Sequence, residues 1–202
     1  RDALIAMRRD FHMYPEPAWL EYRSAAKVAD RLISLGYDVA LGADVLDLDS
    51  RMGLPSDEVM KAAMDRAIKE GANPELVEKM GYGKTAIVAT MKFGGEGPVV
   101  AFRVDMDSND VIEAKEDNHV PAKGGFRSCH DKAMHACGHD AHMTMGLGLA
   151  EYLAAHKDEL KGTIKLIFQP AEEGVRGAKA MAEAGVVDDV DLMFGMHIGF
   201  NE

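Results

Sequence analysis

The sequence predicts an α/β fold in which helices pack on a largely parallel, mixed β-sheet. Segments with the two-residue alternation of strands are interleaved with segments that have the three-and-four spacing of helices, and this order is typical of α/β proteins. A dense apolar run at residues 99–104 predicts a strand that is buried on both faces. With 202 residues, of which 47% are hydrophobic, the chain is long enough to bury a core without disulfides.

The first part of the chain is expected to be mainly helical. Leu4, Met7 and Phe11 fall on one face of the first helix. Pro15 then prevents its continuation. After the second helix, Gly36 stands where a left-handed C-terminal cap would follow. The elements predicted here are helices over 2–13 and 20–35, a short strand over 37–41, a loop over 44–55, a helix from Ser56 to Gly71 and a short helix from Asn73 to about Met80.

The rest of the chain alternates between strands and helices. The predicted elements are strands over 85–93, 99–104, 163–169 and 191–196, and helices over 143–154 and 176–184. Between them, residues 105–139 show little periodicity. So long an irregular stretch inside a compact domain is usually functional.

Charge and composition exclude several classes of function. The sequence has 34 acidic residues against 23 Lys and Arg, and the resulting net charge of -11 disfavours nucleic acid as a partner. No stretch approaches the roughly 20 apolar residues of a membrane span, and the start shows no signal-peptide pattern. Two cysteines, Cys129 and Cys137, are too few for a disulfide framework. We therefore expect a soluble, cytoplasmic protein that binds neither nucleic acid nor membranes.

Polar side chains follow three of the predicted strands, and others stand just before a predicted helix. These residues are Asp105 and Asp107, Glu172 and Glu173, His197, and Cys137 and His139. In open α/β sheets, ligands bind at the carboxyl ends of the strands, where the loops converge. We therefore expect these side chains to point into one crevice.

The segment from 135 to 142 has the composition of a metal site, because it holds three histidines and a cysteine within eight residues. Imidazole and thiolate together suit a borderline-soft divalent ion, and Gly138 lets Cys137 and His139 face one ion. A solvated histidine cluster is the alternative. His135 and His142 are weaker candidates, which we expect to support the ligands or to be ordinary loop residues. The pair at 129–130, Cys and His, is predicted to be a bystander.

Glu172 and Glu173 are adjacent carboxylates, and we expect them to have different roles beside a metal ion. One can bind the ion while its neighbour acts as a general base toward water. An isolated pair at a helix start would instead simply interact with the helix dipole. Asp105 and Asp107 have the period-two spacing of a strand face, and one of them could orient a ligand; a turn or cap is the alternative. His197 is expected to be a ligand because of its place at a strand end.

Taken together, these motifs resemble one family. They are RRDFH at 8–12 with PE at 15–16, RVDMD at 103–107, MHACGHD at 134–140, QPAEEG at 169–174 and MH at 196–197. The chain is similar over nearly its whole length to the amidohydrolase branch of the aminoacylase and carboxypeptidase family of dinuclear metallohydrolases, which includes hippurate hydrolases and auxin-conjugate hydrolases. Within that branch, DSRMGLP at 49–55 and AGVVDDVD at 184–191 resemble the A subunits of aminobenzoyl-glutamate hydrolases.

The resemblance implies a zinc-peptidase-like catalytic domain that holds two divalent metal ions, Mn²⁺ or Zn²⁺. It implies that Cys137, His139, Glu173 and His197 are metal ligands, that Cys137 bridges the ions and that Glu172 is the general base. Residues 1–202 would be the N-terminal part of this domain, with a helical insertion at about 44–80. A lid or dimerisation domain and a C-terminal part with one more ligand histidine are expected beyond this sequence. One departure is Ser108-Asn109-Asp110, where relatives commonly have Ala-Leu-Pro.

The function that the resemblance implies is metal-dependent hydrolysis of an amide between an aryl-acyl group and an amino acid. The favoured substrate is p-aminobenzoyl-glutamate, which would give p-aminobenzoate and glutamate in folate catabolism. A related B subunit or a second copy would bind through the absent domain. The alternatives are a hydrolase of the same family that acts on N-acyl amino acids or dipeptides, and a non-catalytic metal-binding assembly subunit.

Overall fold

Five strands form one mixed sheet in the order β1-β2-β4-β3-β5 in the computed structural model, which describes residues 1–199. The strands are β1 (Asp38–Leu41), β2 (Ile87–Lys92), β3 (Val99–Asp105), β4 (Thr163–Gln169) and β5 (Leu192–Gly195). Strand β3 runs parallel to β4 and β5, whereas β2 is antiparallel to both β1 and β4. The predicted α/β class with a mixed sheet is confirmed, and its parallel part consists of β3, β4 and β5.

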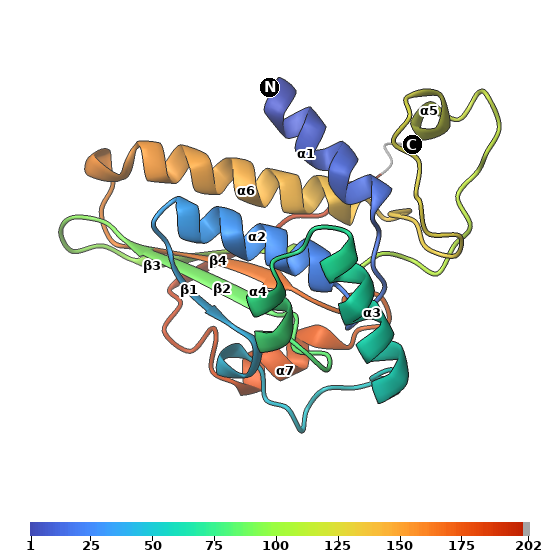
Figure 1. Ribbon diagram of the computed structural model, residues 1–202. Coiled ribbons are helices and arrows are strands. Elements are labelled where there is room, and N and C mark those ends of the chain that lie inside the picture. Colours follow the sequence, from blue (N-terminus) through green and yellow to red (C-terminus); the bar gives the residue numbers. More distant parts are fainter. Residues whose placement is uncertain (200–202) are drawn as a thin grey trace.

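Helices lie on both faces of this sheet. They are α1 (Asp2–Met13), α2 (Tyr22–Ser34), α3 (Asp57–Lys69), α4 (Pro74–Lys79), α5 (Val120–Lys123), α6 (His139–Ala155) and α7 (Gly177–Glu183), with short 3-10 helices η1 (Gly42–Val45) and η2 (Lys157–Glu159). Figure 1 shows α2 and α6 over one face, with α1 against α6, and α7 on the opposite face. None of the helices in residues 1–199 has both the length and the apolarity that crossing a membrane requires.

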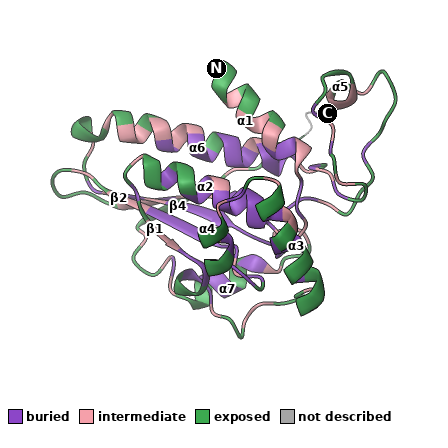
Figure 2. Ribbon diagram, in the orientation of Figure 1, coloured by how far each residue is buried: buried purple, intermediate pink, exposed green. Residues whose placement is uncertain are grey.

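Each face of the sheet carries its own core. The larger core lies under α1, α2 and α6 and includes Phe11, Leu32, Leu147 and Phe168, all of them almost fully buried. The smaller core lies under α7 and centres on Trp19, which is completely buried. Figure 2 shows the resulting pattern, with buried residues on the sheet and on the inner faces of the helices and exposed residues along their outer faces.

The predicted helix ends are confirmed by their hydrogen bonds. Ser56 accepts a hydrogen bond from the Val59 backbone N–H at the start of α3, and Asn73 accepts one from Glu75 at the start of α4. These side chains satisfy backbone donors that have no partner within the helix. Gly36 follows α2 with a φ of +84°, a left-handed conformation that glycine adopts without steric cost.

Three details differ from the sequence-based prediction. Strand β3 is not buried on both faces: Phe102 is half-buried, because it stacks on Phe194 of β5 and all of β5 is exposed. Helix α6 begins four residues earlier than the apolar stripe at Met143 indicates, because its first turn carries polar residues with buried partners. Helix α5 was not predicted, since its four residues are too few to show a period.

The parallel strands end together and so define one functional edge of the sheet. Asp105, the last residue of β3, pairs with Gln169, the last residue of β4. The irregular stretch 106–138 leaves this edge and returns to it, and Figure 1 shows it as an excursion that carries α5. A bridge between Asn109 and Met134 closes its base. The segment before α6 is therefore held against the ends of β3 and β4.

The tight turn between β4 and α7 gives a first prediction. A Cβ atom added to Gly177 would lie 1.8 Å from the Pro170 carbonyl oxygen, which belongs to the backbone and cannot swing aside. We expect Gly177→Ala to lower the free energy of unfolding by about 1–3 kcal/mol through overpacking.

Urea denaturation tests this, with Gly195→Ala as the control. A Cβ at Gly195 meets no atom within 4 Å, so its stability should change by less than about 0.5 kcal/mol. Equal unfolding midpoints for the two variants would contradict the prediction.

Candidate metal centre

The predicted site residues meet at the edge where the parallel strands end. Two groups of possible ligands share His139: one is Cys137, His139 and Glu173, and the other is Asp105, His139, His142 and His197. Within each group, one donor atom from every residue lies within 4.8 Å of the others. The structure therefore brings these side chains together beside a cavity lined by Cys137 and His197, which we call the crevice, and His139 at the first position of α6 belongs to both groups.

His139 presents a free nitrogen to a set of carboxylates. The ring is fully buried, and Nδ1 lies 2.7 Å from the Asp107 carbonyl oxygen, which can only accept a hydrogen bond. The neutral tautomer therefore leaves a lone pair on Nε2, which has no hydrogen-bond partner among the described residues. This nitrogen lies 3.6 Å from Asp105 Oδ1, 3.7 Å from Glu172 Oε2 and 3.9 Å from Glu173 Oε1. A lone pair and three carboxylates around one point suit a cation between them.

The pKa values of His139 and Cys137 also reflect the carboxylates around them. Burial lowers the pKa of His139, but Asp107 and Asp105 outweigh that effect, so its pKa is raised. Burial and the neighbouring Glu173 carboxylate raise the pKa of the Cys137 thiol to about 11. Cys137 is thus a thiol in a negative environment, and a bound metal ion would convert it to a thiolate.

Cys137 and His197 face each other across the crevice. Cys137 Sγ lies 3.6 Å from His197 Nε2. His197 Nδ1 lies 2.7 Å from the Ile198 carbonyl oxygen, so Nδ1 carries the proton and Nε2 is free to bind an ion. Glu173 Oε1 is also buried without a hydrogen-bond partner in the described part of the chain. Thiolate sulfur, imidazole nitrogen and carboxylate oxygen together form a donor set that suits a divalent metal ion.

The backbone before α6 is shaped to present Cys137. Gly138 has a φ of +86°, and a Cβ there would lie 2.1 Å from the Ile198 side chain. Asn109 Oδ1 accepts hydrogen bonds from the backbone N–H groups of Ala136 and Cys137, both at 3.1 Å. Nothing in the sequence around Asn109 indicates this role.

Asp107 holds the two adjacent glutamates in place. Its Oδ1 accepts a hydrogen bond from the Glu172 N–H and its Oδ2 accepts one from the Glu173 N–H, each at 2.9 Å. Through its carbonyl, Asp107 also orients His139. Asp107 thus makes three hydrogen bonds, two with the turn after β4 and one with the start of α6. These are contacts through which it could orient a ligand, as the sequence predicts.

The turn before the glutamates contains a strained backbone conformation, and a buried glutamate from another part of the chain anchors it. Ala171 has a φ of +51°, which is uncommon for a residue with a Cβ. Its N–H donates to Glu21 Oε1 at 2.8 Å, and Glu21 Oε2 accepts from Thr85 Oγ1. Burial and the nearby Asp107 charge raise the pKa of Glu21 to about 8. Glu21 was not predicted, because nothing in its local sequence indicates a position under this turn.

Asp105 and His142 lie beside the centre, and their side-chain polar atoms have hydrogen-bond partners within the chain. Asp105 Oδ2 accepts from Arg103 Nη1 at 2.7 Å and Oδ1 accepts from His142 Nδ1 at 2.5 Å. His142 Nε2 in turn accepts from the Ile198 N–H at 2.9 Å. Neither ring nitrogen of His142 is free, so His142 fixes Asp105 and the chain beside His197.

His135 lies apart from both ligand groups. Its side chain is buried and neither ring nitrogen has a hydrogen-bond partner among residues 1–199. Burial lowers the pKa of His135 to about 4, so the ring is neutral. It lines a cavity of about 370 Å³ together with Arg8, Cys137 and His197.

A network that the sequence did not indicate joins α1 to the start of α6. His12 Nδ1 lies 2.7 Å from Asp140 Oδ2, and His12 Nε2 lies 2.8 Å from Glu113 Oε1. Arg8 Nε lies 2.8 Å from the same Asp140 oxygen. Because Asp140 follows His139 directly, this network fixes the first turn of α6.

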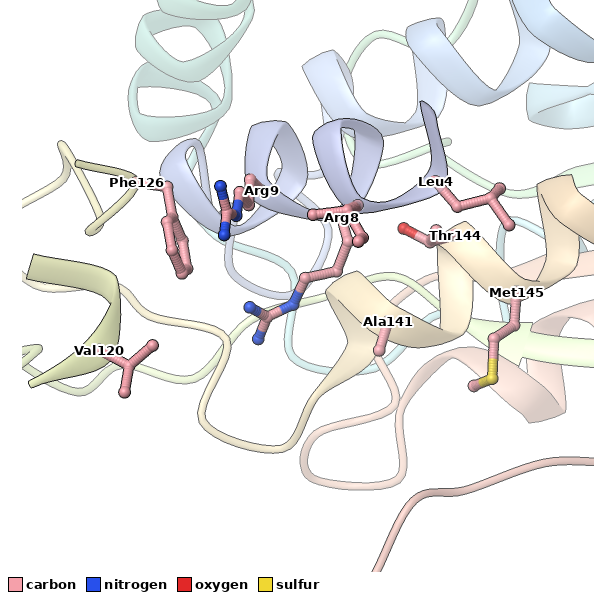
Figure 3. Close-up of a pocket in the computed structure, with 9 residues that line it drawn as sticks. Leu4, Arg8, Arg9, Val120, Phe126, Ala141, Thr144 and Met145 are labelled. Carbon is pink, nitrogen blue, oxygen red and sulfur yellow. The ribbon is translucent and has the colours of Figure 1, made fainter. Parts of the chain in front are cut away.

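Beside this network is an apolar cavity of about 470 Å³, between α1, α5 and α6. Figure 3 shows Arg8 and Arg9 extending into it from α1, with Phe126, Val120 and Met145 around them. Arg9 lies over the Phe126 ring, 4.7 Å from its centroid. The cavity contains none of the predicted ligands, but Arg8 lines both it and the cavity beside Cys137.

Known proteins share this sequence and this fold. The peptidase family M20/M25/M40 matches residues 101–202. The chain is 53% identical to indole-3-acetyl-aspartic acid hydrolase of Enterobacter agglomerans and 52% identical to the A subunit of p-aminobenzoyl-glutamate hydrolase of Escherichia coli, in each case over 95% of the chain and 44% of the relative. It therefore spans less than half the length of these relatives.

Two solved structures resemble it closely. One is the aminobenzoyl-glutamate utilization protein of Klebsiella pneumoniae, with a TM-score of 0.84, 45% identity and coverage of 100% of this chain and 44% of the other. The second is a dinuclear metal binding peptidase of family M20 from Bacillus subtilis, with a TM-score of 0.71, 30% identity and coverage of 98% and 43%.

The geometry around Asp107 predicts the effect of removing one of its oxygens. Asp107→Asn would turn an NH₂ group toward one of the glutamate N–H donors, so one glutamate loses its anchor. We expect Mn²⁺ affinity to fall about 10–100-fold, as is usual when a residue that supports a ligand is changed.

Calorimetric titration of the full-length protein with Mn²⁺ measures this. Asp110→Asn, an exposed aspartate of the same segment, is the matched control and should bind Mn²⁺ as the wild type does. Equal affinity in the two variants would show that Asp107 does not position the site.

The His12 network predicts a pH dependence of stability. Burial lowers the pKa of His12, but hydrogen bonds to Asp140 and Glu113 outweigh it and raise the pKa above 6.5. A histidine whose pKa is raised in the folded state contributes stability that is complete below its unfolded pKa and is lost as the pH rises through the folded value. His12→Gln should therefore lower the free energy of unfolding by about 1–3 kcal/mol more at about pH 6 than at about pH 9.

Urea denaturation at the two pH values measures the difference. Exposed His156 pairs with exposed Glu159, so His156→Gln is a control that should be close to neutral at both. A loss for His12→Gln that is independent of pH would show that the ring is not charged in the folded state.

Proposed function

This chain belongs to the peptidase family M20/M25/M40, and we propose that the protein is a metal-dependent amidohydrolase that cleaves aryl-acyl conjugates of acidic amino acids. We further propose that the chain forms the N-terminal part of the catalytic domain, with a helical insertion at about 44–80. A lid or dimerisation domain and the remaining part of the catalytic domain would complete it, since the relatives are more than twice as long.

The free Nε2 of His139 beside the carboxylates of Glu172 and Glu173 is the observation that carries this proposal. Cys137, His139, Glu173 and His197 would hold two divalent ions, with manganese or zinc as the candidates. The similarity to a dinuclear metal binding peptidase of Bacillus subtilis supports this number. Bound ions would supply Lewis acidity, which polarises an amide carbonyl and lowers the pKa of water.

We propose that Glu172 acts as the general base. Its backbone is fixed by Asp107, its Oε2 points to the same nitrogen of His139 as Glu173 does, and its side chain is one-third exposed. The carboxylate can therefore take a proton from water at the edge of the crevice. It would return this proton to the amine as the amide bond breaks, so that one residue serves both halves of the reaction.

The two relatives that are 53% and 52% identical narrow the substrate class. Their names contain indole-3-acetyl-aspartic acid and p-aminobenzoyl-glutamate, and both compounds join an aromatic acyl group to an acidic amino acid. We favour p-aminobenzoyl-glutamate, a substrate that fits folate catabolism, because the Klebsiella pneumoniae structure is also named for it. Hydrolysis would give p-aminobenzoate and glutamate.

A carboxypeptidase or N-acyl amino acid hydrolase is the second candidate function. Thermostable carboxypeptidase 1 of Saccharolobus solfataricus is 37% identical over 98% of the chain and 39% of that relative. A non-catalytic assembly subunit is less well supported, because such a subunit would need no base beside its ligands.

The partner and the compartment are also proposals. The Escherichia coli relative is named as the A subunit of its hydrolase, which supports pairing with a related B subunit; a homodimer through the absent domain is the alternative. Cys129 and Cys137 are both free thiols, and a cysteine ligand stays reduced in the cytoplasm. We therefore propose a cytoplasmic enzyme with a small-molecule substrate.

Replacing the base separates catalysis from metal binding. Glu172→Ala should keep its metal content but lose turnover by roughly 10²–10⁴-fold, the usual contribution of a general base. The assay is release of p-aminobenzoate from p-aminobenzoyl-glutamate by the full-length protein in excess Mn²⁺, with metal content measured on the same samples.

Glu183→Ala, an exposed glutamate of α7, is the control and should match the wild type. An active Glu172→Ala enzyme would overturn the assignment of the base. A panel that adds indole-3-acetyl-aspartate, an N-acetyl amino acid and a dipeptide tests the proposed substrate class. The proposal is contradicted if the dipeptide is cleaved fastest.

A further inference from the structure

A second group of metal-type ligands lies outside the centre described above. Glu70 directly follows α3, and Cys129 and His130 lie in the irregular stretch before α6. One donor atom from each lies within 4.8 Å of the other two. The sequence predicts that Cys129 and His130 are bystanders of the Cys137 centre, and they do lie outside its ligand groups. They form a cluster of their own with Glu70.

The ring of His130 is oriented as the ring of a metal ligand would be. Its Nδ1 lies 2.7 Å from the Pro15 carbonyl oxygen, which can only accept, so Nδ1 carries a proton. Metal-bound histidines commonly donate their other N–H to a carbonyl in this way. On the opposite side, Nε2 lies 2.8 Å from Glu70 Oε1. A separation of 2.8 Å is that of an N–H···O hydrogen bond, and a zinc ion bound to both atoms would replace this proton and move them to about 3.3 Å apart.

Glu70 and Cys129 supply two further donors. Glu70 Oε2 is buried and has no hydrogen-bond partner among residues 1–199, so this carboxylate has a coordination position to spare. Burial and the Glu70 charge raise the pKa of the Cys129 thiol, with smaller opposite effects from Arg23 and Arg66. Zinc binding would release that proton to solvent, because the thiolate is the ligand.

The surrounding backbone fixes these residues before any ion arrives. The Cys129 N–H donates to the Met13 carbonyl oxygen at 2.9 Å, and Arg23 Nε donates to the Glu70 carbonyl oxygen at 3.1 Å. His130 also lines a cavity of about 410 Å³ beside Leu20 and Arg66. Neither Glu70 nor Cys129 lines this cavity, so it reaches the cluster from the His130 side alone.

We propose that Glu70, Cys129 and His130 form a second, mononuclear zinc site. The protein ligands are Cys129 Sγ, His130 Nε2 and a Glu70 carboxylate oxygen, a mixture of thiolate, imidazole and carboxylate that suits tetrahedral zinc. The ion joins the end of α3 to the segment that leads to Cys137, so it braces the helical layer against the loop of the main centre. This site does not depend on the proposed hydrolase activity.

Cobalt substitution tests the site, because a cobalt ion bound to a thiolate gives a charge-transfer absorption band that cobalt bound to nitrogen and oxygen alone does not give. In the full-length protein, the substitution Cys137→Ser removes the thiolate of the main centre. We expect this variant to retain a thiolate-to-cobalt band that saturates with one equivalent. Adding Cys129→Ser should abolish the band.

Zinc content gives a second readout that leaves both cysteines in place. Glu70→Gln should contain one equivalent of zinc less than Glu75→Gln, a matched exposed glutamate of the neighbouring helix α4. The proposal is overturned if Cys137→Ser shows no thiolate-to-cobalt band, if the band survives Cys129→Ser, or if the two glutamate variants bind equal zinc. In those cases a proton alone joins His130 to Glu70.

Discussion

The hydrogen bonds of Asp107 are the interaction on which the centre depends. Its carboxylate accepts the N–H groups of Glu172 and Glu173, and its carbonyl accepts His139 Nδ1. These contacts join the end of β3, the turn after β4 and the first turn of α6. A buried carboxylate is costly unless it is fully hydrogen-bonded. Here each bond that satisfies Asp107 also positions a residue of the crevice.

The cost of this arrangement is a concentration of negative charge. The carboxylates of Asp105, Glu172 and Glu173 surround one free nitrogen of His139, and like charges at this separation repel. Within residues 1–199, the polypeptide alone leaves Glu173 Oε1 and His139 Nε2 buried and unpaired. Divalent cations would balance both the charge and the orphaned atoms. In metalloproteins, folding around a site of this kind is coupled to metal binding.

Much of the fold was readable from local sequence, because its signals are local. Ser56 and Asn73 begin helices and Gly36 ends one, each through hydrogen bonds or φ values within a few residues. The convergence of the site residues followed from a general rule about parallel strands rather than from spacing. The sequence did not predict that Glu21 contacts Ala171 or that His12 contacts Asp140. Each of these contacts joins residues more than 100 positions apart. The role of Asn109 became clear only from the two backbone N–H groups that it holds.

The crevice around His139 is proposed to hold two divalent metal ions. X-ray diffraction from crystals of the full-length protein with Mn²⁺, recorded where manganese scatters anomalously, locates the ions directly. We expect two anomalous peaks within bonding distance of Cys137 Sγ, His139 Nε2, a Glu173 carboxylate oxygen or His197 Nε2. A map with no peak at these atoms under excess Mn²⁺ would contradict the account.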